Sequence, residues 1–265
     1  MNLLNRFVNQ SEFESYEDYY NNFKLLIPED FNFAYDVIEE YAKIAPEKRA
    51  LVWCNDEGEE KIFNFSELNR EVNKTANFFK RIGIKKGDFV LLILRRHYQF
   101  WTSIYALHKI GAVAIPATHL LTKKDIVFRC NSADVKMIVC TNYGETREHV
   151  EASIPECKTL EKCCILGEEK YDGWYNLDTE IKTESDEFPR PTGEDATHNG
   201  DPMLVYFTSG TTGNPKMVLH TFTYPLGHIS TGKYWHDVVD DGLHLSVADT
   251  AWAKCSWGKL YGQYI

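Results

Sequence analysis

The sequence has little of what membrane proteins and nucleic-acid-binding proteins need. Its longest apolar run, Phe89 to Leu94, is far shorter than the ~20 apolar residues with which a helix spans a bilayer. Lysine and arginine number 29 against 39 aspartates and glutamates, which gives a formal net charge of -10. Binding to a phosphate backbone requires clustered positive charge. The composition therefore predicts no membrane partner and no nucleic-acid partner.

Residue spacings typical of metal sites and disulfide frameworks are also absent. The seven cysteines include the adjacent Cys163 and Cys164 but no Cys-x-x-Cys pair. Residues 1–30 are polar and acidic and lack the pattern of a secretory signal. Four histidines recur every eight residues, but eight residues turn a helix by about 800°, so they do not align on one face. We expect reduced thiols, a cytoplasmic location and no metal site, even at the histidine series His220, His228, His236 and His244.

The chain does have the composition and pattern of a folded α/β protein. Hydrophobic residues make up 43% and aromatic residues 14% of its 265 residues, which excludes a disordered chain. Ser66 can cap a helix that Gly83 ends, since apolar residues recur between them at about four-residue spacing. Strands at 89–94, 112–115 and 135–140 then alternate with helices around 101–108, which Gly111 closes, and 123–130. This alternation predicts βαβ units and a largely parallel sheet.

We expect four regions along the chain. Residues 1–30 form an N-terminal extension, and 31–178 form a first α/β subdomain. Residues 179–202 hold three prolines, many acids and almost no large apolar residue, so they are predicted to be a linker or surface loop. Residues 203–265 are expected to begin a second, incomplete subdomain.

A loop rich in glycine and hydroxyl groups lies between two predicted strands. The strands are Met203 to Phe207 and one that begins near Val218, and the loop reads Thr-Ser-Gly-Thr-Thr-Gly-Asn-Pro-Lys. Its glycines allow positive φ and can turn backbone N–H groups towards bound oxygens. Its hydroxyls and its lysine can contact phosphate. The candidate phosphate-binding residues are Thr208, Ser209, Gly210, Thr211, Thr212, Gly213 and Lys216.

Two other interpretations of this loop fit less well. A Walker A loop requires Gly-x-x-x-x-Gly-Lys followed by Ser or Thr. Counted from Gly210, Pro215 stands at the second glycine and Met217 at the Ser/Thr position, which disfavours a kinase-like phosphotransferase. A surface turn without function is the other possibility, because short Gly/Ser/Thr turns are common. The ordered combination ending in Pro-Lys favours phosphate binding.

The loop resembles the signature of the adenylate-forming, AMP-binding enzymes, which include acyl-CoA synthetases. Thr208 to Lys216 fills every position of that signature, and Met217 follows as in the acetyl- and medium-chain acyl-CoA synthetase branch. The stretch Asp249 to Gln263 is similar to the Asp-x-Gly-Trp segment of that branch, with Ala251 where glycine is usual. The resemblance extends from about Phe31 onward.

The resemblance implies a layered α/β fold of the N-terminal domain of these enzymes, without their small C-terminal domain. Family members are roughly twice as long as this chain. Their later Tyr-Gly-x-Thr-Glu motif and catalytic lysine have no counterpart here, so the catalytic residues are expected beyond Ile265. The resemblance also implies an acyl pocket built from the Asp-x-Gly-Trp segment. Two indoles can wall an apolar cavity, and bulky walls favour short- to medium-chain acids; the candidates are Trp252, Lys254 and Trp257.

The implied reaction joins a small carboxylic acid to CoA with ATP and Mg²⁺, through an acyl-adenylate. Two interpretations stay open: the N-terminal part of such an enzyme, and a stand-alone remnant that binds nucleotide weakly at most. In either case we expect that residues 1–265 alone form no acyl-CoA. The sequence makes no prediction of the oligomeric state.

Overall fold

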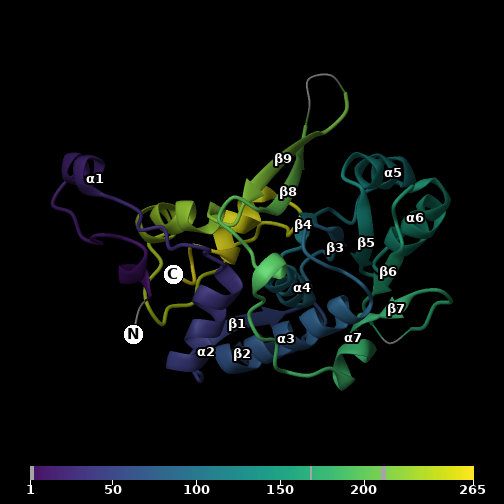
Figure 1. The fold of residues 1–265 in the computed structure, drawn as a ribbon, viewed down its shortest axis with the longest axis horizontal. Coiled ribbons are helices and arrows are strands. Elements are labelled where there is room, and N and C mark those ends of the chain that lie inside the picture. The colour runs from purple at the N-terminus through teal and green to yellow at the C-terminus, as the bar shows by residue number, and fades with distance from the viewer. Residues whose placement is uncertain (1–2, 168, 210–212) are drawn as a thin grey trace.

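The structure, a computed structural model, describes residues 3–167, 169–209 and 213–265. Its centre is a seven-stranded sheet with the order β7-β6-β5-β3-β4-β8-β9 (Figure 1). Every neighbouring pair is parallel except β8 and β9, which form an antiparallel hairpin. The strands are β3 (Phe89–Ile93), β4 (Val113–Pro116), β5 (Val135–Cys140), β6 (Lys162–Ile165), β7 (Tyr175–Asn176), β8 (Pro202–Thr208) and β9 (Lys216–Thr221).

Helices pack on both faces of this sheet. In β3, Val90 and Leu92 belong to the buried cluster that includes α3 and α4, whereas Leu91 and Ile93 belong to the cluster that includes α5 and α6. A strand that is covered on both faces has no polar alternation, which explains the continuous apolar run. The layered α/β fold with a mainly parallel sheet is confirmed. The helices are α3 (Phe65–Arg81), α4 (Gln99–Ile110), α5 (Lys123–Ser132), α6 (Thr146–Ser153) and α7 (Leu177–Glu180).

The predicted helix after Ser66 is present, but Ser66 does not cap it. Asn64 is the N-cap of α3: its side chain accepts a hydrogen bond from the backbone N–H of Glu67, and the Glu67 carboxylate accepts one from the backbone N–H of Asn64. This reciprocal pair is a capping box. Ser66 therefore lies within the first turn. The predicted core residues of the helix, Leu68, Val72, Ala76 and Phe79, are fully buried.

The segment 179–202, predicted to be a linker or surface loop, is anchored to the body of the protein. The Asn73 side chain on α3 donates a hydrogen bond to the Asp186 carbonyl (2.8 Å), and Phe188 is buried. Thr197 lies against the C-terminal end of α4, which Gly111 closes at φ +85° as predicted. A Cβ on Gly111 would lie 3.0 Å from the Thr197 methyl, so this contact requires glycine.

The expected break between two subdomains does not interrupt the sheet. β8 pairs with β4, with Leu204 opposite Ala114, so the hairpin β8–β9 extends the same sheet that holds β3 and β5. The division of the chain into regions stays a prediction, with the hairpin β8–β9 joined to the sheet of the first region. β8 pairs with a strand that lies about 90 residues earlier in the chain. Because no local sequence pattern indicates so distant a partner, the sequence did not predict this pairing.

The N-terminal residues and a small second sheet complete the structure. Phe7 is buried and packs edge-on against Phe31, with ring centroids 5.5 Å apart, so the extension contributes to the core. Four further elements frame this part: α1 (Tyr16–Asn22), α2 (Glu40–Ile44) and the antiparallel pair β1 (Arg49–Cys54) and β2 (Glu60–Asn64). After β9 the chain forms short helical turns, of which α8 (Ala253–Cys255) is α-helical.

Candidate functional site

The glycine- and hydroxyl-rich loop lies at the tip of the hairpin β8–β9, which projects from the body of the protein (Figure 1). Thr208 and Lys216 face each other at the base of the loop as the last pair of the hairpin, and both are exposed. Gly213 has φ +92°, in the region that favours glycine. The Lys216 ammonium has no hydrogen-bond or ion-pair partner within the described chain. The other candidates here are Ser209, which is exposed, and Gly210, Thr211 and Thr212, which lie outside the described residues.

The loop follows the carboxyl end of a strand that runs parallel to β4. In open α/β sheets, ligands bind at the carboxyl edge of the strands. Two neighbouring strands place further polar groups at this edge: Arg95 follows β3, and Tyr143 follows β5. The Arg95 guanidinium lies 3.7 Å from the centre of the Tyr143 ring, and the Arg95 backbone has a positive φ of 48°. Non-glycine residues in such strained conformations are enriched at functional sites.

The segment that begins at Asp249 is attached to the same edge. The Thr250 hydroxyl donates a hydrogen bond to the Arg95 carbonyl, and the Arg96 guanidinium lies 4.0 Å from the Asp249 carboxylate. Asp249 also accepts a hydrogen bond from the backbone N–H of Ala251 (3.0 Å). Ala251 is not among the residues with positive φ, so the turn accommodates alanine where the resembling segment has glycine.

Two of the three predicted acyl-pocket residues lie together. The Lys254 ammonium lies 5.9 Å from the Trp257 ring centre, whereas Trp252 points to solvent with 69% of its surface exposed. Two further aromatic residues, which the sequence did not indicate, lie against Trp257. His236 stacks on it at 5.8 Å with an interplanar angle of 11°, and Trp235 lies 6.1 Å away. The adjacent Trp-His pair in a polar stretch was the only sequence signal for this contact.

The aromatic segment is joined directly to the strand that carries the loop. The Ser256 and Tyr206 hydroxyls share a buried hydrogen bond, and Tyr206 belongs to β8. Tyr105 of α4 donates to the Leu260 carbonyl (2.8 Å). Strand β8, the edge residues after β3 and the aromatic segment thus form one connected region.

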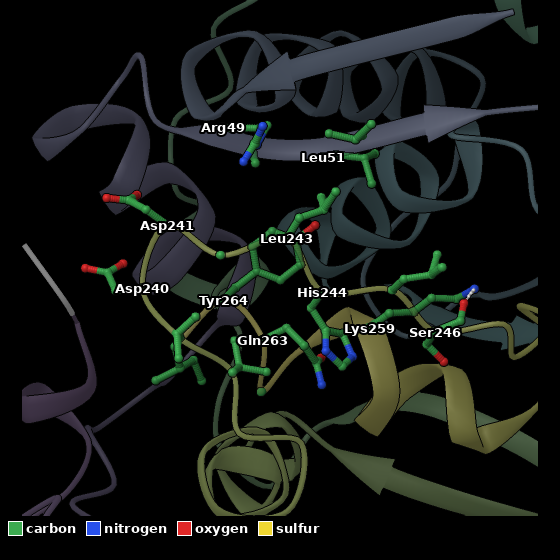
Figure 2. Close-up of a pocket in the computed structure, with 18 of the residues that line it drawn as sticks. Arg49, Leu51, Asp240, Asp241, Leu243, His244, Ser246, Lys259, Gln263 and Tyr264 are labelled. Atoms are coloured by element: carbon green, nitrogen blue, oxygen red, sulfur yellow. Dashed lines mark hydrogen bonds between the residues drawn. The ribbon is translucent and has the colours of Figure 1, made fainter.

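A cavity of about 470 Å³ lies beside this region, between β1 and residues 238–247 (Figure 2). Lys259 lines it, but Trp252, Lys254 and Trp257 do not. The Lys259 ammonium donates hydrogen bonds to the carbonyls of Ser246 (3.2 Å) and Ala248 (2.5 Å). Burial lowers the pKa of Lys259, since desolvation disfavours its charged form.

Comparison with known proteins identifies the family. The family model described as "AMP-binding enzyme" matches residues 38–261. The chain belongs to the AMP-binding enzyme family. The mitochondrial acyl-coenzyme A synthetases ACSM3 of Pongo abelii and of Homo sapiens are each 35% identical to this chain over 268 residues. The alignment covers 98% of this chain and 45% of each relative. The mitochondrial acyl-coenzyme A synthetase ACSM5 of Rattus norvegicus is 33% identical over 238 residues, covering 87% and 40%.

A solved structure shares the fold of this chain. The anthranilate CoA ligase AuaEII, in complex with anthranoyl-AMP, superposes with a TM-score of 0.77 at 22% identity, over 90% of this chain and 44% of that chain. The chain therefore spans a little under half the length of the proteins it matches. Its similarity to the acyl-CoA synthetases confirms the family resemblance of the sequence.

Two further findings concern metals and membranes. The described residues contain no group of three or more His, Cys, Asp or Glu side chains that could hold a metal ion. No helix within the described ranges is long and apolar enough to cross a membrane. The names of the relatives above place them in mitochondria, so the cytoplasmic location stays a prediction.

Proposed function

We propose that this chain is the N-terminal part of an AMP-forming acyl-CoA synthetase. The observation that carries the proposal is the hairpin β8–β9: it presents the signature loop beyond the carboxyl edge of the sheet, with Lys216 exposed and without a partner in the described chain. The residues present suit a polyphosphate, because Gly213 has the backbone conformation of an anion-binding turn and Thr208 offers an exposed hydroxyl.

The loop would act in the first half of the reaction. A substrate carboxylate attacks the α-phosphorus of ATP, the bond to the β-phosphate breaks, and pyrophosphate leaves with the negative charge. Fixed donors near that charge lower the barrier. We assign this role to Lys216 and to the hydroxyls of Thr208, Ser209, Thr211 and Thr212, with Gly210 and Gly213 shaping the turn. Mg²⁺ bound to the phosphates would neutralise charge in the same place. CoA thiolate would then displace AMP from the acyl-adenylate to give the thioester.

The acid is proposed to bind at the aromatic segment. Trp257, with Lys254 over its ring and Trp235 beside it, offers apolar walls and one cation. Trp252, although exposed, belongs to the same proposed pocket. Bulky indoles leave room for a short- to medium-chain acid. Substitution of Trp257 by alanine would enlarge the pocket, with a gain of at most about 0.8 kcal/mol for each additional buried methylene.

The test is an analysis of products from a protein that contains this chain and spans the full length of the relatives. With ATP, Mg²⁺, CoA and acids of two to twelve carbons, we expect acyl-CoA, AMP and pyrophosphate in equal amounts, with the highest rates for the shorter acids. The 265-residue chain alone serves as the control and is expected to form no thioester. Formation of ADP and phosphate would contradict the proposal, since it requires attack at the γ-phosphorus.

A further inference from the structure

The 470 Å³ cavity beside β1 has no part in the proposed reaction. Its volume lies within the ~300–1,000 Å³ typical of small-molecule sites. Figure 2 shows Leu51 of β1 on one side and Leu243 across from it, with Lys259 and Ser246 towards one end. Most of the wall is aliphatic or aromatic, including Leu51, Phe65, Trp101, Ile229 and Leu243. Such walls select a ligand with a hydrocarbon part.

The charge of the lining is opposite in sign to the charge of the whole chain. The cavity is lined by five lysines and arginines but by only two acidic side chains, in a chain of net charge -10. Both acids, Asp240 and Asp241, already pair with Lys48. Of the remaining cations, Arg96 and Lys259 can compensate a ligand's negative charge. Asp249 lies 4.0 Å from Arg96 and also attracts Lys259.

Lys259 is a half-buried cation of the lining without an ion-pair partner in the described chain. Its two hydrogen bonds go to backbone carbonyls, which carry no net charge, and it forms no ion pair with a carboxylate of the described chain. A partly buried ammonium without a counter-ion is unfavourable. By contrast, Lys109, which is fully buried on α4, has the Glu39 carboxylate 2.6 Å away. Lys259 retains one N–H for an anion, beside the ring of Trp101 at 5.6 Å.

We propose that this cavity binds an amphipathic carboxylate, with the carboxylate on Lys259 and the hydrocarbon tail between Leu51 and Leu243. Arg96 supplies the second positive charge at the same end. An inorganic anion would leave the apolar walls unused, and a neutral lipid would leave Lys259 uncompensated. The site shares no residue with the Trp252, Lys254 and Trp257 pocket, so it is a separate site for acids.

Calorimetric titration of the 265-residue chain with octanoate, without ATP, tests the proposal. We expect octanoate binding that Lys259→Gln weakens, with octanol at least about tenfold weaker at this cavity because it lacks the charge-assisted hydrogen bond. Affinity should increase up to about fourfold with each added methylene from butanoate to octanoate. Equal affinities for octanoate and octanol, or no binding of octanoate, would overturn the proposal. The titration needs no nucleotide, so a negative result contradicts this binding site without contradicting the proposed synthetase function.

Variants separate the head group from the tail. Lys259→Gln should weaken octanoate binding at least about tenfold and leave octanol binding unchanged. Unchanged octanol binding also shows that the cavity is still formed. Lys259→Arg should restore octanoate binding. Leu243→Trp, at a position 69% exposed and therefore free of overpacking, should abolish the gain with chain length. Lys124→Gln, on the exposed surface of α5, is the matched control. Wild-type octanoate affinity in both Lys259→Gln and Leu243→Trp would refute the site.

Discussion

At the residue scale, the ammonium of Lys109 shows how this fold tolerates a charge in its core. The side chain is fully buried on α4 and lies 2.6 Å from the Glu39 carboxylate, with hydrogen bonds to Asn69 (3.0 Å) and Asn73 (2.7 Å). Burial lowers the pKa of Lys109 to about 8. Burial opposes the ionisation of Glu39, but the hydrogen bonds and attraction of Lys109 and Lys43 together outweigh it, so the pKa of Glu39 lies below its ordinary value.

Removal of the counter-charge should therefore destabilise the protein strongly. Glu39→Gln is expected to lower the free energy of unfolding by about 3–5 kcal/mol, because it leaves a buried ammonium unpaired. Glu40→Gln, which removes only the surface pair with Arg6, should cost at most about 1 kcal/mol. Urea unfolding at pH 7 gives both values. An equal decrease in the free energy of unfolding in the two variants would show that the buried pair stabilises the protein no more than the surface pair does.

The same pair has a definite pH dependence. A carboxyl whose folded pKa is depressed contributes stability that is present above its unfolded pKa, 4.5 for Glu39, and lost as the pH falls. The difference in unfolding free energy between wild type and Glu39→Gln should therefore narrow below about pH 4.5.

At the element scale, local patterns predicted the elements, and tertiary contacts decided what the patterns could not. The four-residue spacing of Leu68, Val72 and Ala76 and the run at β3 depend on near neighbours in sequence, so these elements were predictable. The pairing of β8 with β4 and the anchoring of 179–202 on α3 depend on distant residues. The same holds for His236 and His244, whose rings lie 5.1 Å apart because the chain between them is not helical.

The capping of α3 can be tested at this scale. Asn64→Ala removes the side-chain acceptor of the capping box and should cost about 0.5–2 kcal/mol of stability. Ser66→Ala should change stability by less than about 0.5 kcal/mol, since Ser66 lies inside the helix and its hydroxyl accepts one long hydrogen bond, from the Arg70 guanidinium (3.4 Å). Thermal unfolding of both variants measures the difference. A larger loss of stability in Ser66→Ala than in Asn64→Ala would indicate that Ser66, as the sequence suggested, is the N-cap.

At the scale of the whole molecule, a single sheet places the loop of the hairpin β8–β9 at the edge where Arg95 and the Asp249 segment also lie. The sequence predicted the phosphate-binding loop, because the glycines, hydroxyl groups and lysine that define it are close together in the sequence. It did not predict Trp235 and His236 beside Trp257, since nothing in their spacing indicates that contact.

The most direct measurement is the carboxylate-dependent exchange of labelled pyrophosphate into ATP, in a protein that contains this chain and spans the full length of the relatives. Exchange reports formation of the acyl-adenylate without CoA. We expect Lys216→Ala and Thr211→Ala each to reduce it at least about tenfold, the value of one charge-assisted contact, while the exposed control Lys158→Ala keeps the wild-type rate. Wild-type exchange in Lys216→Ala and Thr211→Ala would remove the loop from the mechanism and contradict the account.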